Sequence, residues 1–467
     1  MHSRPTATVL LTLALLAGCG GHESKKKNNS TTAPVTTAPV NSNNQTPPNA
    51  TLALAAIGSA TEARIGSNAV GLVLELSVTG ADAVSISSLT IAAIGSINEA
   101  TELGALRLVG DDNRNGLVDA GERVLATAAS PAFTQDDGSV SLAFTQALQI
   151  APNARIQVLV AADVVGGTAV SKVGKALAFQ VTAAGSVAAS AKQQPIVAQG
   201  SFPIGGSRTL FLHDHLLISE VVTLPTASEY VEIFNPTGRV IDLSNYYLTD
   251  STNNTTPPAN YHLVPTGAGF LPALTSDYMV RFPAGSSIAP GVAKVIAIDG
   301  TTFRTSFPQR SPDFAMRNPG QGTAQMLTFA AGAWTAVAAG VAVGLTDGGE
   351  PVFLFQWDGQ SDLVKDVDQV FWGTSTATNG HAEKTGVSVD GPDAGTTPSV
   401  YLADTPGFQQ DSRNAPRPVA ATSALQRIEF TELGQTASGG NGITGGDETS
   451  EPWNVNFVLG VPTPGVP

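Results

Sequence analysis

Side chains of alternating character run through much of the chain after residue 50, and this period of two limits the possible folds more than any other feature. In 72–78, leucine or valine stands at every even position, and 140–144 and 156–160 repeat the pattern. Successive side chains of a strand point to opposite faces of a sheet, so each run predicts a strand with one buried face. Long stretches with the helical period of about 3.6 do not occur. We therefore expect an all-β protein.

The first folded region is expected at residues 51–201. Its apolar positions change parity between 84–86 and 89–91, which predicts a β-bulge at Ser87-Ser88. Turn residues separate the apolar runs throughout this region, as they do in proteins built from short antiparallel strands. A β-sandwich of about seven or eight strands is the expected solution.

The N-terminus has the marks of a bacterial signal peptide. Arg4 supplies a positive charge, and the apolar run 9–17 is too short to cross about 30 Å of hydrocarbon as a helix. The run ends in Leu16-Ala17-Gly18-Cys19, which resembles the lipobox of bacterial lipoproteins. The resemblance implies cleavage after residue 18 and lipid, palmitate included, on Cys19. The alternative is an ordinary signal peptide followed by an unmodified cysteine.

Residues 19–50 are expected to form a disordered tether. Beyond the basic stretch 25–27 they are mostly Asn, Ser, Thr and Pro, a composition that cannot bury enough apolar surface to fold. We expect a protein of the bacterial cell envelope, held to the membrane by its N-terminal lipid. Gly20, rather than Asp, follows Cys19, which by resemblance to the best-known sorting rule is compatible with the outer membrane.

Charge argues against a nucleic-acid partner. The chain has 38 acidic and 24 basic residues, a net charge of −14. Binding to phosphates requires clustered Lys and Arg, which this balance does not provide. Cys19 is the only cysteine, so stability outside the cytoplasm must come from packed cores or a bound ion.

One turn of the first domain fits the twelve-position calcium loop. Gly116 at position 6 allows the sharp turn, and the flanks 105–109 and 123–125 are expected strands, so the ion would clamp a hairpin. Calcium takes about six to eight oxygen ligands. We therefore predict a structural calcium site; the alternative is an Asn/Asp/Gly turn that needs no metal. The ligands, at positions 1, 3, 5, 7 (by its carbonyl), 9 and 12, are Asp111, Asn113, Asn115, Leu117, Asp119 and Glu122.

A second series of strand-like segments begins after residue 201. Its motifs are ISE at 218–220, EYVEIFNP at 229–236 and IDLSNYYLTD at 241–250, three short strands separated by turns. Together they resemble the lamin-tail domain, an immunoglobulin-like β-sandwich of nuclear lamins and of many bacterial secreted proteins. The resemblance implies such a domain over about residues 212–467. Further agreement lies in 367–373, 423–428, 453–454 and 462–465.

Residues 251–366 depart from the compact pattern of that family. They contain strand-like runs of their own at 293–298 and 352–357. The stretch is either an insertion on the sandwich or a set of extra strands that widen it. The expected fold is therefore two immunoglobulin-like β-sandwich domains, at 51–201 and 202–467, after a signal peptide at 1–18 and the tether.

Signals of an enzyme are weak. His213 and His215 alternate, so their rings share one face if the segment is a strand, but two ligands do not make a zinc site, and a solvated strand edge is favoured. The aspartates of 362–368 indicate a solvated acidic turn rather than a second cation site. Neither a Gly-x-Ser-x-Gly nor a His-Glu-x-x-His motif occurs.

We therefore expect a non-enzymatic, lipid-anchored envelope protein that presents β-sandwich domains for binding or scaffolding. Its partner would be a protein or polysaccharide of the envelope, and no catalytic residue is assigned. The alternative is an envelope hydrolase, or an accessory subunit of one, with a metal and carboxylates in 251–366. A pocket that joins His262 or His381 to two carboxylates would favour the alternative.

Overall fold

The computed structural model describes residues 46–467, except 254–258, 268–275, 331–332, 339–340, 376–379 and 421–422. Cys19 and most of the predicted tether lie outside the described residues, so the expectations about them stay predictions.

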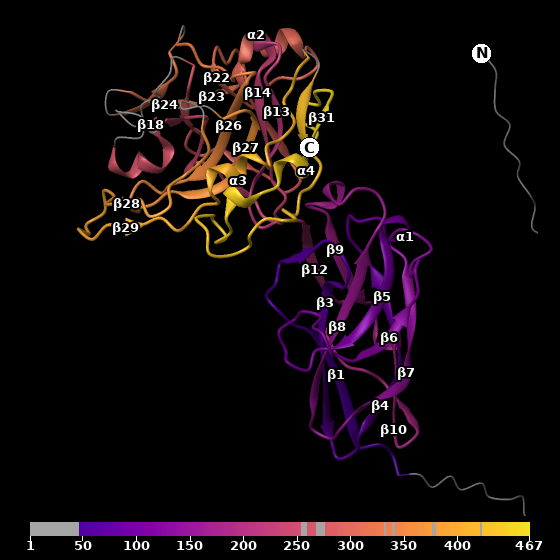
Figure 1. Ribbon diagram of the computed structural model, residues 1–467. Helices are drawn as coiled ribbons and strands as arrows, with labels where there is room; N and C mark the ends of the chain where they lie inside the picture. The colour runs from indigo at the N-terminus through magenta and orange to yellow at the C-terminus, as the bar shows by residue number, and fades with distance from the viewer. Residues whose placement is uncertain are drawn as a thin grey trace, which may run out of the picture. The chain divides into compact units, whose positions relative to one another are not determined.

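The first part of the described chain forms two sheets, which we call the first sandwich. Figure 1 shows its strands in indigo and magenta. The elements are β1 (Ala50–Ala56), β2 (Glu62–Arg64), β3 (Ala69–Gly80), β4 (Val84–Ala93), α1 (Glu99–Glu102), β5 (Leu103–Gly110), β6 (Val124–Ala128), β7 (Ser139–Ile150), β8 (Arg155–Val164), η1 (Val170–Lys172), β9 (Ala176–Val181), η2 (Ala184–Ser186), β10 (Val187–Ala191), β11 (Gln194–Ile196) and β12 (Ile204–Phe211).

The remaining elements form the second sandwich, coloured from pink to yellow in Figure 1. They are β13 (Leu217–Val222), η3 (Thr226–Ser228), β14 (Tyr230–Phe234), β15 (Ile241–Asp242), β16 (Tyr246–Thr249), β17 (Thr252–Asn253), β18 (Ala259–Asn260), η4 (Tyr261–Thr266), β19 (Met279–Arg281), β20 (Ser287–Ile288), β21 (Ala293–Asp299), α2 (Gly300–Ser306), β22 (Phe314–Arg317), β23 (Ala324–Gln325), β24 (Leu327–Ala330), β25 (Ala333–Ala336), β26 (Gly349–Gln356), β27 (Lys365–Gly373), β28 (Ser388–Val389), β29 (Ser399–Val400), α3 (Gly407–Asp411), β30 (Ala424–Arg427), η5 (Glu448–Ser450), α4 (Trp453–Asn456) and β31 (Phe457–Gly460).

The prediction of an all-β fold built from sandwiches is confirmed. Within the described ranges the longest α-helix, α2, has 7 residues. None of the helices there combines the length and the apolar character needed to cross a bilayer.

The first sandwich pairs a sheet of order β1-β3-β8-β5-β6 with one of order β11-β10-β4-β9-β12-β2, in which β7 also pairs with β4. The period of two decides which side chains enter the core. Leu72, Leu74 and Leu76 of β3 lie in the main core, whereas Val73 belongs to a separate cluster with Val109. The described strands of the two sheets outnumber the predicted seven or eight, because short edge strands such as β2 and β11 carry little apolar pattern.

Two details of the first sandwich bear on the predictions. The register of β4 against β7 shifts between Ile86 and Ser88, which confirms the predicted bulge. β12 begins at Ile204, beyond the predicted end of the domain at 201, yet it pairs with β9. The sheets of the first sandwich therefore extend to Phe211, because β12 is needed to cover the edge of β9.

The second sandwich pairs a seven-stranded sheet of order β23-β22-β21-β14-β13-β30-β31 with a six-stranded sheet of order β25-β24-β19-β16-β26-β27. Ile218, Val231, Leu248, Leu354 and Trp372 are buried in its main core. Residues from both sheets thus share one apolar interior, which the hydrophobic effect stabilises.

The stretch 251–366 contributes strands to these same sheets. β21 pairs with β14, and β26 pairs with β16. Of the two alternatives for this stretch, the structure has extra strands that widen the sandwich, and describing 251–366 as an insertion is wrong. The late segment 424–460 completes the seven-stranded sheet, since β30 pairs with β13 and with β31.

Candidate functional site

The predicted calcium loop joins β5 to β6, which pair as an antiparallel hairpin and so confirm the predicted strands on its flanks. Asp111 is buried at the start of the loop. Its two carboxylate oxygens accept hydrogen bonds from the backbone N–H groups of Asn115 at 3.1 Å and Gly116 at 3.0 Å. Gly116 has φ +76°, a left-handed conformation that side-chain-bearing residues rarely adopt. The loop therefore has the sharp turn that the glycine predicted.

The other predicted ligands gather around Asp119. Its Oδ2 accepts hydrogen bonds from the side-chain amides of Asn113 at 2.7 Å and Asn115 at 2.6 Å. Glu122 Oε2 accepts the Asp119 N–H at 3.0 Å, and Glu122 Oε1 is buried without a hydrogen-bond partner in the described chain. If the side-chain amides of Asn113 and Asn115 each rotated by half a turn, they would present oxygen rather than nitrogen to a cation. Leu117 has an exposed side chain, and its N–H donates to Asn115 Oδ1 at 2.8 Å.

The calcium loop also walls an open pocket of about 690 Å³. Arg208 of β12 reaches this pocket and is 6% exposed. Burial lowers the pKa of its guanidinium, and in the described chain no carboxylate pairs with it. Its hydrogen bond to the Gly116 carbonyl oxygen is long, at 3.5 Å. The pocket is lined by, among others, Glu62, Arg64, Asn68, Leu117, Asp119, Arg208 and Phe211.

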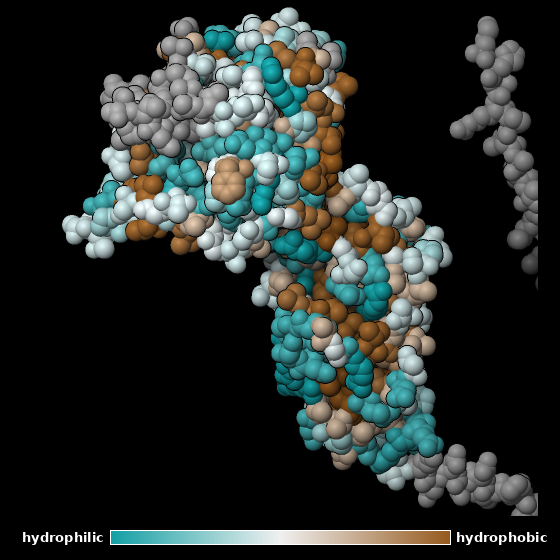
Figure 2. Space-filling view, in the orientation of Figure 1, coloured by the Kyte–Doolittle hydropathy of each residue, from teal (hydrophilic) through white to brown (hydrophobic). Residues whose placement is uncertain are grey.

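The loop covers apolar surface as well. Val118 packs on the small cluster formed by Val73, Val109 and their neighbours on the outer face of the five-stranded sheet. Figure 2 shows hydrophobic surface over β3, β5 and β8 of this sheet. An ordered calcium loop therefore protects part of that face from water.

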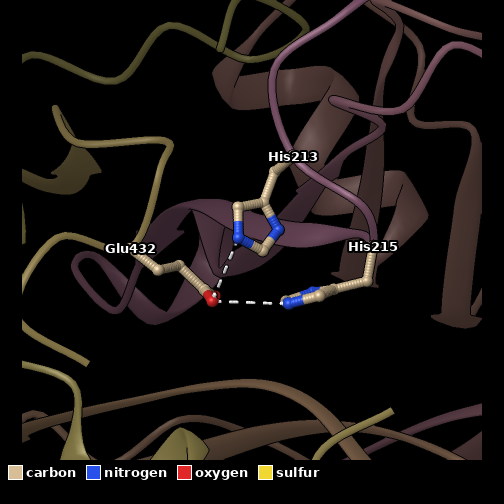
Figure 3. A group of neighbouring side chains, drawn as sticks. All are labelled: His213, His215 and Glu432. Atoms are coloured by element: carbon tan, nitrogen blue, oxygen red, sulfur yellow. Dashed lines mark ion pairs between the residues drawn. The ribbon is translucent and has the colours of Figure 1, made fainter. Parts of the chain in front are cut away.

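A second cluster lies in two loops that flank strands of the second sandwich. It consists of His213 and His215, before β13, and Glu432, after β30. Figure 3 shows both imidazoles pointing at one carboxylate oxygen. His213 Nε2 and His215 Nε2 each lie 3.4 Å from Glu432 Oε2. The rings are 4.4 Å apart between centroids and nearly perpendicular. We call these three residues the histidine cluster.

The histidine cluster is buried. Side-chain exposure is 13% for His213, 1% for His215 and 3% for Glu432. Burial, followed by the charge of His215, lowers the pKa of His213 to about 4. Burial also lowers the pKa of His215, but the Glu432 carboxylate outweighs it and raises that pKa above its ordinary value.

The prediction of a solvated strand edge at His213 and His215 is wrong. Both residues lie in the loop between β12 and β13, and His215 is buried against Glu432. Glu432 comes after β30, far away in sequence, and no spacing rule links it to the histidines. The folded chain therefore supplies the third potential ligand that the sequence did not reveal.

Comparisons with known proteins bear on the second sandwich. The model of the Lamin Tail Domain family matches residues 213–374. This part of the chain belongs to the lamin tail domain family. The match confirms the resemblance, begins at His213 and includes all of 251–366. Its extension over 375–467 stays a prediction.

Two other comparisons add no function. A crystal structure of a DUF4876 family protein from Bacteroides thetaiotaomicron matches with 14% identity and a TM-score of 0.27, over 61% of this chain and 77% of that one. No curated protein matches the chain.

The prediction that the aspartates of 362–368 form a solvated turn is wrong for two of them. Asp366 and Asp368, near the start of β27 in the lamin tail domain, are buried. Asp366 Oδ2 accepts a hydrogen bond from Lys384 Nζ at 2.6 Å. Asp368 accepts two from Arg427 at 2.8 Å, and Arg427 also binds Glu451. The alternation of β27 turns these carboxylates inward, where each meets a cation from a distant segment.

His262 and His381 do not form the pockets that would have favoured an enzyme. In the described chain, neither belongs to a group of three potential metal ligands. His262 lies against the rings of Tyr261 and Tyr401. His381 stacks on Phe371 and lies near Asn414 and Asp411.

A group of three buried carboxyls also lies within the lamin tail domain. Asp250, Asp277 and Glu350 bring oxygens within 4.8 Å of one another. Burial, reinforced by Glu350 and Asp277, raises the pKa of Asp250 well above its ordinary value. Burial likewise raises the pKa of the nearby Glu229 to about 8. Such carboxyls hold protons in the folded state, because like charges in a dry site oppose ionisation.

Glu229 gives the lamin tail domain a testable pH dependence. Its pKa rises from an ordinary value of 4.5 to about 8 on folding, so the folded state binds more protons between these pH values and stability falls as pH increases. Glu229→Gln removes this titrating group. The free energy of unfolding of the variant should therefore decrease less steeply with pH, by up to about 1.4 kcal/mol per pH unit. Urea unfolding at pH 5 to 8 measures the slope. The exposed control Glu383→Gln should leave it unchanged, and equal slopes in the wild type and Glu229→Gln would contradict the assignment.

Proposed function

We propose that this chain is a non-enzymatic, lipid-anchored protein of the bacterial cell envelope that displays its two sandwiches for binding or scaffolding. The observation that carries the proposal is the open pocket beside the calcium loop. Loops and pockets on a rigid β-scaffold are where such proteins bind partners. The lipid on Cys19, the tether and the outer-membrane location belong to the same proposal and are supported by the lipobox-like sequence.

The pocket favours a partner with an acidic group. Arg208 is a buried guanidinium to which the described chain offers no carboxylate, and a guanidinium binds carboxylates in a bidentate manner. Glu62 and Asp119 also line the pocket, and their carboxylates would repel further negative charge. The part of the partner next to its acidic group would therefore be neutral and polar. An acidic polysaccharide or an acidic protein segment of the envelope has this chemistry.

Calcium in the loop at 111–122 is the second part of the proposal, and its role is structural. The ion would replace the hydrogen bonds among Asn113, Asn115 and Asp119 with oxygen ligation. It would hold Val118 over the apolar cluster and Asp119 at the pocket wall. Calcium would thereby stabilise the first sandwich and shape the pocket.

The alternative function is an envelope hydrolase, or an accessory subunit, with a metal and carboxylates in the second sandwich. The observation that favours it is the histidine cluster, which lies outside the residues 251–366 first considered. Turnover of envelope polysaccharides, peptides or phosphate esters by the purified chain would support this alternative and contradict the display function.

The calcium site predicts a metal-dependent stability. Asp111→Ala and Glu122→Ala should lower the thermal midpoint of the first sandwich by more in calcium than in chelator. In chelator only the hydrogen bonds to these carboxylates are lost, whereas in calcium the stabilisation by an ion that binds only the folded state is lost as well. Differential scanning calorimetry measures the midpoints. Asp112→Ala is the control, since this exposed neighbour is not among the predicted ligands. Equal midpoints of the wild type in calcium and in chelator would contradict the proposal.

The anchor predicts where the protein is found in cells. Cys19→Ala should move the protein from the membrane fraction to the soluble fraction, because the lipid is the proposed attachment. Fractionation followed by immunoblotting measures the distribution, with Ser24→Ala as the control. Continued sedimentation of Cys19→Ala with membranes would argue against lipidation.

The pocket predicts which substitution abolishes binding. Arg208→Gln should weaken binding of an acidic envelope polysaccharide or protein by about tenfold or more, because a buried charge-assisted pair is lost. Binding to fractionated envelope components is measured by surface plasmon resonance, and an unchanged thermal midpoint shows that the variant folds. Arg155→Gln, whose side chain is 67% exposed, is the control. Equal binding by Arg208→Gln and the wild type would exclude this pocket as the site.

A further inference from the structure

We propose that the histidine cluster is a zinc site, in which His213 Nε2, His215 Nε2 and one carboxylate oxygen of Glu432 bind a single ion. The site is separate from the calcium loop in place and in chemistry. It gathers two imidazole nitrogens and one carboxylate, whereas the calcium loop offers oxygens alone.

The distances within the histidine cluster fit zinc. Zinc bonds to imidazole nitrogen and carboxylate oxygen are about 2.0–2.1 Å long, so neighbouring ligands on a tetrahedron lie about 3.3–3.4 Å apart. Both histidine nitrogens lie 3.4 Å from Glu432 Oε2. Charge-assisted hydrogen bonds between nitrogen and oxygen are shorter, at about 2.7–2.9 Å. The cluster therefore has the spacing of ligands around an ion rather than that of hydrogen-bonded partners.

Hydrogen bonding prepares His215 as a ligand. Its Nδ1 lies 2.9 Å from the Leu216 carbonyl oxygen, which can only accept, so Nδ1 carries a proton. In the neutral ring the lone pair of His215 is then on Nε2, facing Glu432. A backbone carbonyl on the outer nitrogen is the usual partner of a metal-binding histidine, because it sets the tautomer and the ring orientation.

Buried polar atoms in the cluster lack partners. His215 Nε2, His213 Nδ1 and Glu432 Oε1 have no hydrogen bond within the described residues. The lone pair of the neutral His215 Nε2 and the Glu432 carboxylate face each other in a dry site, where they repel unless a positive charge lies between them. A proton on His215 would satisfy one nitrogen–oxygen pair, whereas an ion at the centre would bind His213 Nε2, His215 Nε2 and Glu432 Oε2 together.

Neighbouring charges increase the need for a cation. Asp368 and Glu448 each place an oxygen within 4.8 Å of Glu432, and all three residues are buried. The nearby guanidinium of Arg427 is bound to Asp368 and to Glu451, as its hydrogen bonds show. A divalent ion would offset the negative charge of Glu432 within this group of buried acids.

The backbone at Glu432 also indicates a constrained position. Its φ is +55°, in the left-handed region that a glutamate seldom adopts. Residues held there are found disproportionately at functional sites, because the surrounding structure must compensate for the strain. This conformation directs the Glu432 carboxylate toward the two rings in Figure 3.

The donor set selects zinc over calcium and magnesium. Those harder cations take about six to eight or about six oxygen ligands, respectively, whereas two imidazoles and a carboxylate suit zinc. Three protein ligands leave one tetrahedral position for water, which can enter beside the 13% exposed side chain of His213. The ion would connect the loop before β13 to the loop after β30.

Zinc binding by the purified full chain tests the proposal. After treatment with chelator and dialysis, the chain is titrated with zinc chloride in excess calcium, which occupies the oxygen ligands of the calcium loop. Competition with a chromogenic zinc chelator gives the stoichiometry and affinity, and calorimetry gives the change in thermal midpoint. We expect one zinc ion per chain and a higher midpoint of unfolding for the second sandwich.

Variants assign the site. His213→Gln and Glu432→Gln should each weaken zinc binding by about tenfold or more, the first with little loss of metal-free stability because His213 is the most exposed ligand. His381→Gln removes a histidine outside the cluster and should bind zinc as the wild type does. Absence of zinc binding by the wild type, or equal binding by His213→Gln and the wild type, would overturn the proposal. Loss of binding in His381→Gln would overturn it as well.

Discussion

The buried guanidinium of Arg427 connects the two sheets of the second sandwich, and much of the structure around it depends on this interaction. Arg427 lies on β30 of one sheet and donates to Asp368 on β27 of the other, to Glu451, and to the Ile218 carbonyl oxygen on β13. Removing one partner of such an ion pair leaves an unpaired charge in the dry interior, which lowers the free energy of unfolding by about 3–5 kcal/mol. The arrangement therefore holds distant segments in register as well as stabilising the sandwich.

This arrangement places other polar groups under the same constraint. Once Asp368 and Glu451 are bound to Arg427, the carboxylate of Glu432 must find its counter-charge elsewhere, and it faces His213 and His215. The same rule holds in the first sandwich, where Asp111 is buried beneath backbone N–H groups of the calcium loop. Both candidate cation sites thus arise where a β-scaffold buries carboxylates, and the type of donor atom distinguishes them. They fit a protein with a single cysteine, whose stability comes from packed cores or a bound ion rather than from disulfides.

The sequence was a good guide where the signal is local. Alternation in β3 correctly separated the core residue Leu74 from Val73, and the parity change correctly located the bulge near Ser88. The lamin-tail motifs were sufficient to identify the family. Prediction failed where burial depends on distant partners: the aspartates of β27 are paired inside the sandwich because Lys384 and Arg427 arrive from later segments. Glu432 joined the histidines for the same reason, and no sequence spacing could have revealed it.

By itself, then, the amino-acid sequence determined the longer strands, the sharp turn of the predicted calcium loop and the match of residues 213–374 to the lamin tail domain family. These properties depend on neighbours a few positions apart, since strand alternation and turn chemistry are local. Only the tertiary structure decided that 251–366 widens the sandwich, that Arg208 faces a pocket, and that His213, His215 and Glu432 meet. Those outcomes depend on which distant surfaces pack together, because the cost of burying a charge is set by partners that only the folded chain brings near.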